Sequence, residues 1–318
     1  MKSTDLEFVR DFTRDIPRGL SSRYLSEQAV PQARWQAPDV ILDRRALAYD
    51  PENPGGKILI GAFGDKLIGI EDNRHVLTVA GNRAGKSVTI VANLLFYRGS
   101  VLAMDPKAEL ANITAERRAA LGQKVIVLDP FNHANKRLAR FRKRYNPLAV
   151  LTLDNPTIIE DAGLIADALV VTTPNSKDPH WDESGKNFIE GLELQVATDP
   201  IYEGRRNLLT VRELIKRALS KIPAGPGDDD DEPRFVVKEQ MLENAARLQG
   251  NSSTAHIGAA IEGAALDFYE KSDRERSAVL STVRRHTKLL DYAAMKNVLS
   301  GSDFDLADLK RDPKGVTV

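Results

Sequence analysis

The sequence contains no cysteine among its 318 residues. This absence excludes disulfide bonds, thiolate metal ligands and a cysteine nucleophile, and it fits a reducing compartment. The five histidines are scattered without ligand spacing, so we expect no zinc site. No apolar run reaches the roughly 20 residues that a membrane-spanning helix needs, and residues 1–20 are too charged for a signal peptide. These absences predict a soluble, unsecreted protein.

An excess of charge of one sign is also missing, because 45 basic residues balance 45 acidic residues. The charge of the whole chain therefore gives no argument for a nucleic-acid or acidic partner. The content of 42% hydrophobic and 28% charged residues is that of an ordinary globular protein, and the length is sufficient for one large domain or two.

Residues 76–91 are the most informative stretch of the chain. An apolar, strand-like run over 76–79 leads into a turn of small residues that ends in Gly85-Lys86-Ser87, and an apolar run with helical spacing follows. A phosphate-binding loop needs this order of strand, loop and helix. The leading glycine of the usual G-x-x-x-x-G-K-[ST] pattern is Ala80 here, which is the mildest replacement. The flanking elements and the full spacing argue against a chance Gly-Lys-Ser.

The loop residues have distinct expected roles in binding a nucleoside triphosphate. Gly85 lets the backbone approach the phosphates, and Lys86 places an ammonium between the β- and γ-phosphates. The Ser87 hydroxyl is the expected ligand of Mg²⁺. We predict that a nucleoside triphosphate and Mg²⁺ bind here with Lys86 as the catalytic residue, and that the nucleotide-binding residues are Gly81, Asn82, Arg83, Ala84, Gly85, Lys86 and Ser87.

The surrounding segments predict an α/β fold. The expected elements are a hairpin over 57–61 and 66–70, a strand over 76–79, a helix over 86–97, a strand over 100–105, a helix over 106–121 and a strand over 124–129. Strands that are apolar throughout and alternate with helices indicate a parallel sheet covered on both faces. The nucleotide site then lies at the carboxyl ends of these strands.

Two of these strands end on an acid. Asp105, together with Glu109, is expected at the mouth of the site, with either an accessory role in the nucleotide pocket or subunit contact, or a structural role in capping the second helix. Asp129 ends the third strand, where many P-loop proteins place a metal-binding aspartate. Because Pro130-Phe131 follows without a neighbouring glutamate, we favour a structural role for Asp129.

Charge is uneven along the chain. Five consecutive acids at 228–232 follow a Pro/Gly-rich segment and indicate an exposed loop. Residues 1–54 indicate an N-terminal extension that packs on the next domain or is partly disordered. A basic cluster fits either a nucleic-acid backbone contact or a solvated loop, and it consists of Lys136, Arg137, Arg140, Arg142, Lys143 and Arg144, interleaved with Phe141 and Tyr145.

From residue 157 to about 292 the pattern is helical. The expected helices cover 158–171, 184–197, 209–219, 236–249, 253–269 and 274–288. A turn and short helix over 303–310 follow, and 315–318 has the pattern of the start of a strand. Because a domain seldom ends on the first residues of a buried strand, we expect that the chain is truncated before its sheet is complete.

Several separated motifs together resemble the VirD4/TraG family of type IV secretion coupling proteins. The resemblance extends from about residue 55 to the end, and the ordered set is more specific than the phosphate loop alone. The motifs are residues 79–87 and 99–109, Tyr145-Asn146-Pro147-Leu148, His180-Trp181, Ser281-Thr282-Val283, Phe304-Asp305-Leu306 and Lys310-Arg311-Asp312-Pro313.

The resemblance implies a RecA-like P-loop NTPase domain with a parallel sheet that is interrupted by an all-α domain. The implied organisation is an N-terminal extension over 1–54, the first part of the nucleotide-binding domain over 55–156, the all-α domain over 157–292, and a return to the nucleotide-binding domain over 293–318.

The resemblance also implies a homo-hexameric ATPase that brings relaxase-bound single-stranded DNA, effector proteins or both to a secretion channel. Such a protein works in the bacterial cytoplasm, at the cytoplasmic face of the inner membrane. A ring calls for an arginine acting on a neighbouring subunit, and Arg284 or Arg285 could supply it. Another DNA-translocating P-loop motor of the helicase or partition type, and a non-catalytic cargo adaptor, are the alternatives.

Two features depart from this family. Its members usually carry N-terminal membrane helices, which this sequence lacks, so we expect docking at the membrane through partners. The acidic Walker B strand that should bind Mg²⁺ and activate water is expected beyond Val318. We therefore expect the 318-residue chain to be a poor ATPase.

Overall fold

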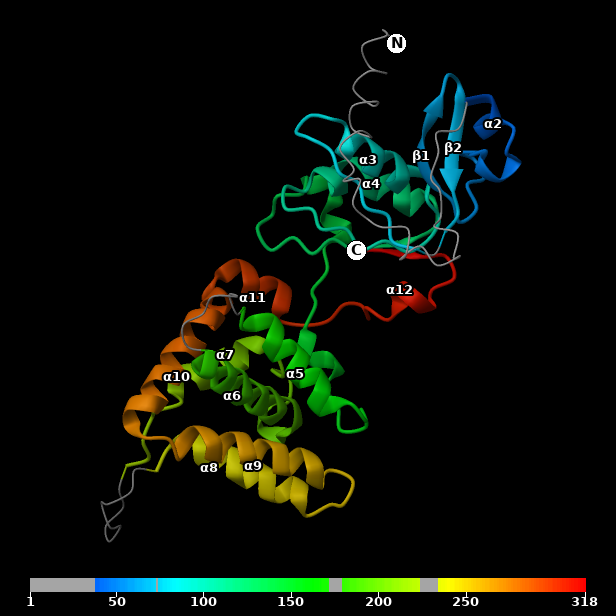
Figure 1. Ribbon diagram of the computed structural model, residues 1–318. Helices are drawn as coiled ribbons and strands as arrows, with labels where there is room; N and C mark the ends of the chain where they lie inside the picture. Colours follow the sequence, from blue (N-terminus) through cyan, green and yellow to red (C-terminus); the bar gives the residue numbers. More distant parts are fainter. Residues whose placement is uncertain (1–37, 73, 172–178, 224–233) are drawn as a thin grey trace, which may run out of the picture.

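The computed structural model describes residues 38–72, 74–171, 179–223 and 234–318. Figure 1 shows an α/β part, which begins with the described residues from 38 and also holds the C-terminal end, and a helical part below it. The acidic run at 228–232 and most of the expected N-terminal extension lie outside the described residues. No helix in the described part is long and apolar enough to cross a membrane.

The α/β part begins with α2 (Pro38–Leu42), the 3₁₀ turn η2 (Arg45–Leu47) and a hairpin. Strands β1 (Ile58–Phe63) and β2 (Lys66–Ile70) pair antiparallel, which confirms the predicted hairpin. The turn needs Gly64, whose φ is +61°. Gly69 is needed for another reason, because an added Cβ would lie 2.5 Å from the ring of Tyr49.

The two helices that the sequence predicts after the hairpin are both present. Helix α3 (Lys86–Phe96) follows the loop, and α4 (Glu109–Ala120) starts three residues later than expected. The side chain of Asn93 fixes α3 to β1, since its amide accepts from the backbone of Leu59 at 2.8 Å and donates back to it at 2.9 Å.

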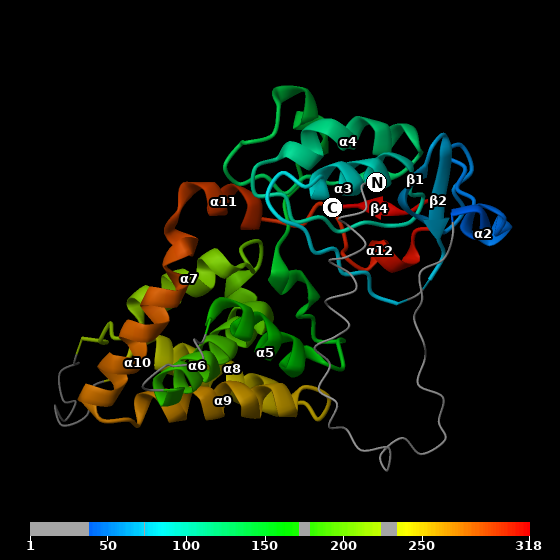
Figure 2. The same ribbon diagram turned by 45° about the horizontal axis from the view of Figure 1, so that its top comes forward.

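The C-terminal strand lies inside the sheet. Strand β4 (Val316–Thr317) pairs parallel with β3 (Lys124–Val125), and its other edge bonds to the segment around Val101. The amide of Val101 donates to Val316 at 2.8 Å, and the amide of Ile126 donates to Thr317 at 2.8 Å. The observed order is therefore 101–103, then 316–318, then 124–126, with parallel pairing throughout. Figure 2 labels β4, the middle segment.

The predicted strand over 76–79 is wrong for the described residues. No strand pairs with this run, and Leu77 and Val79 are 87% and 84% exposed. An apolar run forms a strand only where a neighbour accepts its backbone hydrogen bonds, and the described part offers it no such neighbour. The strand predicted over 100–105 is likewise reduced to a short pairing at 101–103.

The helical part confirms the all-α pattern of the middle of the chain. Its helices are α5 (Ile158–Leu169), α6 (Pro179–Thr198), α7 (Leu208–Arg217), α8 (Val236–Gln249), α9 (Ala255–Tyr269), α10 (Asp273–His286) and α11 (Ala293–Leu299). After α11 the chain returns through α12 (Asp308–Arg311) to β4.

Helix α6 lies in the centre of the helical part and packs against α5, α8, α9 and α10. The rings of Phe188 on α6 and Phe268 on α9 stack with centroids 3.8 Å apart. At Gly191 an added Cβ would lie 2.4 Å from Ala264, so glycine is what allows α6 and α9 to approach so closely.

One carboxylate in this core has no partner. Glu193 on α6 is 0% exposed, and neither of its carboxylate oxygens forms a hydrogen bond. Burial, with a smaller contribution from the nearby Glu190, raises the pKa of Glu193 well above its ordinary value. The folded state therefore holds the Glu193 proton more tightly than the unfolded chain does.

This burial gives a testable stability effect. A raised folded pKa means that the free energy of unfolding falls as pH rises from the ordinary carboxyl pKa toward the folded pKa. Glu193→Met removes both the unpaired group and its proton, so we expect it to stabilise the chain by about 1–3 kcal/mol at pH 7. Denaturant unfolding at pH 5, 7 and 9 measures this, and the advantage should grow with pH.

The matched control is Glu183→Met, which changes a carboxylate on the same helix that is 67% exposed. Glu183→Met should leave the pH dependence of the free energy of unfolding unchanged. A loss of stability in Glu193→Met at every pH would contradict the idea that Glu193 is a destabilising group.

Candidate functional site

The predicted phosphate loop leads directly into the N-terminus of α3. Gly85 precedes the helix with φ +88°, and Arg83 also has a left-handed backbone with φ +63°. The amides of Val88 and Thr89 donate to the carbonyl of Gly85 at 3.0 and 3.2 Å. The first turn of α3 thus begins at Gly85, and the positive end of the helix faces the loop.

Lys86 is held across this loop. Its ammonium donates to the carbonyls of Ala80 at 2.6 Å and Gly81 at 2.7 Å, while the neighbouring Ser87 is exposed. A helix N-terminus, a loop lysine and an adjacent hydroxyl are the donor set that a triphosphate with Mg²⁺ requires. These residues fit ATP and Mg²⁺: Lys86 would face the phosphates, and Ser87 would be the ligand of the metal ion.

The acids near the loop have different surroundings. The carboxylate of Asp105 accepts from the amides of Glu109 at 3.0 Å and Ala111 at 2.9 Å, so Asp105 caps the start of α4. Glu109 is exposed, and its side chain has no partner in the described part. Neither acid forms a hydrogen bond or ion pair with the described loop, so the observed contacts favour the capping role left open for Asp105.

Asp129 is also bound to its own segment. Its carboxylate accepts from the amides of His133 at 2.8 Å and Ala134 at 3.0 Å, and it pairs with Arg142 at 3.0 Å. Burial raises the pKa of Asp129, but these hydrogen bonds outweigh it and hold the pKa below its ordinary value. The contacts agree with a structural role and leave no free carboxylate for a metal ion.

Several cations of the basic cluster form hydrogen bonds or ion pairs within the chain. Arg142 pairs with Asp129, and Arg144 pairs with Asp303 at 2.8 Å. Arg137 donates to the carbonyl of Asn112 at 2.6 Å. Sequence alone treats all six cations as equivalent, whereas the structure uses at least half of them to connect segments of the chain.

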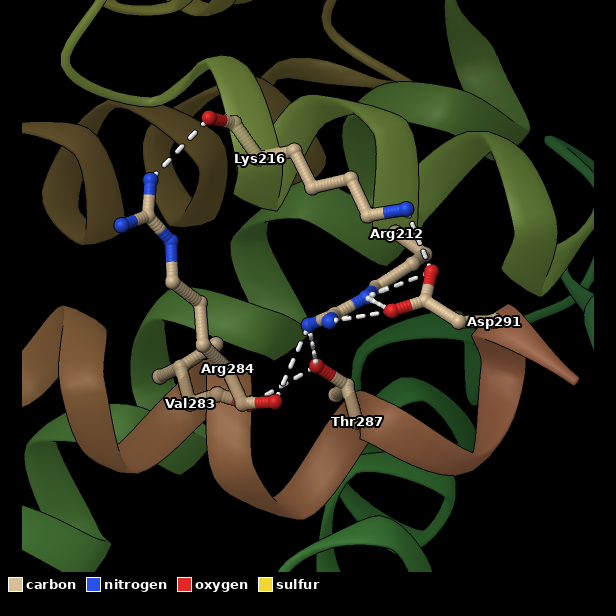
Figure 3. Close-up of polar contacts among 6 residues, drawn as sticks. All are labelled: Arg212, Lys216, Val283, Arg284, Thr287 and Asp291. Atoms are coloured by element: carbon tan, nitrogen blue, oxygen red, sulfur yellow. Dashed lines mark hydrogen bonds and ion pairs between the residues drawn. The ribbon is translucent and has the colours of Figure 1, made fainter.

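The two arginines considered for a neighbouring subunit lie in the helical part. Arg284 donates to the carbonyl of Lys216 at 3.0 Å, and Arg285 lies 3.8 Å from Asp182. In Figure 3, Arg284 approaches α7 and contributes its backbone carbonyl to a polar network. The structure does not bring either arginine into contact with the described loop.

The network in Figure 3 joins α7 to the last turn of α10 and to the 3₁₀ turn η6 (Thr287–Asp291) that follows it. Arg212 donates to the carboxylate of Asp291 at 2.6 Å, to the hydroxyl of Thr287 at 2.8 Å and to the carbonyl of Arg284 at 3.1 Å. Arg212 and Lys216 together hold the pKa of Asp291 well below its usual range. Sequence reasoning missed this group because its members are up to 79 residues apart.

A hollow of about 460 Å³ lies between α5 and α6, away from the loop. Its charged lining includes Glu160 and Glu190, and Lys186 is already paired there with Asp167 at 2.9 Å and Glu183 at 3.1 Å. No group of three or more histidine or acidic residues is placed to hold a metal ion in the part of the chain that the structure describes.

A substitution at Asp129 separates its structural role from a metal-binding one. Asp129→Asn weakens the bonds from His133, Ala134 and Arg142, so we expect a loss of about 1–3 kcal/mol at pH 7. Because a lowered pKa stabilises the fold above the ordinary aspartate range, the loss should shrink as pH falls through the folded pKa. Thermal unfolding between pH 7 and pH 2 measures this loss of stability.

Binding of Mg²⁺–ATP by Asp129→Asn should be unchanged. The control for the stability measurement is Asp65→Asn, a substitution in an exposed turn. A folded Asp129→Asn protein that no longer bound Mg²⁺–ATP would place this carboxylate in the site after all.

Residues 42–318 match the family model described as type IV secretory system conjugative DNA transfer. The type IV secretion system-coupling protein VirD4 of Bartonella quintana is 24% identical over 280 residues, covering 84% of this chain and 39% of that protein. The conjugal transfer protein TraG of Escherichia coli is 25% identical over 252 residues, covering 77% of this chain and 35% of the relative.

A shorter stretch is more similar to another relative. The protein VirD4 of Agrobacterium fabrum is 42% identical over 120 residues, which is 37% of this chain and 17% of that protein. The chain thus spans 39% or less of the length of these curated relatives. Because the family model covers far more than half of the residues, the chain belongs to the type IV secretory system conjugative DNA transfer family.

Proposed function

We propose that this chain contains the phosphate-binding and helical portions of a coupling ATPase that delivers relaxase-bound single-stranded DNA, protein effectors or both to a type IV secretion channel. The observation that carries the proposal is the loop at the start of α3, where Lys86 lies across the carbonyls of Ala80 and Gly81. Membership of the conjugative DNA transfer family supports the same role.

The proposed nucleotide site is the loop from Gly81 to Ser87. The amides at the start of α3 hold phosphate oxygens, and Gly85 keeps the backbone open to them. Lys86 would neutralise charge that develops on the phosphoryl group passing to water. Ser87 would hold Mg²⁺, whose charge would lower the repulsion between the phosphates and the attacking water. The parallel pairing of 101–103, 316–318 and 124–126 supports a RecA-like sheet beside this loop.

The acid that activates water is a separate requirement. Asp105 caps α4 and Asp129 is bound to Arg142, so neither carboxylate is available for that task in the observed arrangement. We therefore propose that the 318 residues bind ATP and hydrolyse it slowly. The working form is proposed to be a homo-hexamer at the cytoplasmic face of the bacterial inner membrane, in contact with relaxase and channel components.

The test is Lys86→Ala, measured for ATP affinity and for conjugative transfer in cells. Loss of one charge-assisted interaction of about 1.5–3 kcal/mol corresponds to roughly 10- to 100-fold weaker ATP binding. Transfer should fall to background. Lys66→Ala is the matched control, because Lys66 is an exposed lysine at the start of β2 in the same part of the molecule.

The possible outcomes separate the rival functions. Unimpaired transfer with Lys86→Ala would contradict the proposal. Loss of ATP binding with normal transfer would favour a cargo adaptor that does not use the nucleotide. Loss of a DNA-dependent activity in cells without relaxase or channel genes would instead favour a general DNA-translocating motor.

A further inference from the structure

The chain passes between the α/β part and the helical part twice, over residues 144–147 and again over 298–304 (Figures 1 and 2). The two passages are hydrogen-bonded to each other. The amide of Tyr145 donates to the carbonyl of Val298 at 2.9 Å, and the amide of Asp303 donates to the carbonyl of Arg144 at 3.0 Å. We refer to these two paired segments as the neck.

Side chains strengthen the pairing of the neck. The guanidinium of Arg144 donates to Asp303 at 2.8 Å, and the Arg144 amide donates to the same carboxylate at 2.8 Å. These bonds hold the pKa of Asp303 down at about 2, so Asp303 is ionised at neutral pH. The hydroxyl of Ser302 accepts from the amide of Asn146 at 3.0 Å.

Each end of the neck enters a different hydrophobic core. In the α/β part, Phe304 packs with Ile126 and Val316, and the ring of Tyr145 lies 5.6 Å from the ring of Phe304. Only Asn146 and Pro147 separate Tyr145 from Leu148, which is buried in the core of the helical part. The first passage is therefore too short to adopt many conformations, and Pro147 restricts its backbone further.

The helical end of the neck is fixed as well. The side-chain amide of Asn146 donates to the carbonyl of Arg206, just before α7, at 2.6 Å. The second passage follows α11, and Leu299 at the end of that helix packs against the helical core. The pair of Arg212 with Asp291 holds the segment that precedes α11 against α7 (Figure 3).

We propose that the neck sets the orientation of the helical part relative to the phosphate loop, and that Arg144 and Asp303 are its positioning residues. Both motifs that supply the neck, Tyr145-Asn146-Pro147-Leu148 and the segment around Phe304, lie outside the proposed nucleotide-binding loop. A second step rests on the proposed function: the neck transmits conformational changes at the phosphate loop to the helical part during transfer.

Orientation is measured directly by double electron–electron resonance on the 318-residue chain. The chain has no native cysteine, so Ala120→Cys on α4 and Ala259→Cys on α9 introduce the only two labelling sites, both exposed. The parent double-cysteine protein should give one narrow distance distribution. Arg144→Glu places two negative charges together in the neck, and we expect it to shift or at least double the width of that distribution.

The controls match the change in charge and exposure. Arg137→Glu reverses an arginine that is 55% exposed and faces Glu116 within the α/β part, compared with 52% exposure for Arg144. It should leave the distribution narrow, and Arg144→Lys should keep it close to that of the parent. Asp303→Asn provides a second disruption of the neck in case Arg144→Glu does not fold.

Unchanged distributions in both folded Arg144→Glu and Asp303→Asn would overturn the proposal. Broadening by Arg137→Glu as well would overturn it too, because the effect would then not belong to the neck. In cells, Arg144→Glu should lower transfer at least tenfold while ATP affinity stays within twofold of the parent.

A broadened distribution with normal transfer would overturn the coupling role alone. The distance measurement does not depend on ATP or on transfer. A failure of the Lys86→Ala test would therefore contradict the proposed function without changing what the labels report about the neck.

Discussion

The placement of β4 between residues 101–103 and β3 is the constraint on which the rest of the structure depends. The three segments bond in parallel, although 215 residues separate Val101 from Val316. The buried guanidinium of Arg118 supports this junction, since it donates to the carbonyl of Gly99 at 2.8 Å and to the hydroxyl of Thr317 at 2.8 Å. Burial lowers the pKa of Arg118 to about 10, and these acceptors compensate for its desolvation. The helical part is therefore an insertion into the α/β part, and its two ends must emerge side by side.

Sequence periodicity predicted most of the helices because each buries an apolar stripe that repeats locally. Helix α8 has the predicted bounds, Val236–Gln249, and α3 differs from its predicted bounds by one residue. The strand predicted over 76–79 was wrong for a physical reason, because a strand is defined by hydrogen-bonding partners elsewhere in the chain and not by its own pattern. The loop from Gly81 to Ser87 was predictable because its glycine, lysine and serine are consecutive, although its nucleotide remains a proposal.

The polar contacts were much less predictable. Asp105 and Asp129 both end expected strands, and only the structure shows that backbone amides occupy the carboxylates of both. The pairing of Arg212 with Asp291 joins residues on separate helices, and no local spacing indicates it. Glu193 is the opposite case, because nothing in the local sequence distinguishes it from other helix acids such as Glu190, and its carboxylate nevertheless lies unpaired in the core.

The neck shows why the location of an ion pair matters more than its strength. Arg144 is 52% exposed and Asp303 is 29% exposed, so water and salt weaken their attraction, and such a pair adds little to global stability. Its effect is geometric, because it acts where two short passages join two separately packed cores. A small interaction energy in the neck changes the populations of different orientations of whole domains. The same energy on a helix surface changes only the populations of side-chain rotamers. The energy required to reorient the helical part can thus be far smaller than the energy required to unfold it, which is the property that a nucleotide-driven change in orientation needs.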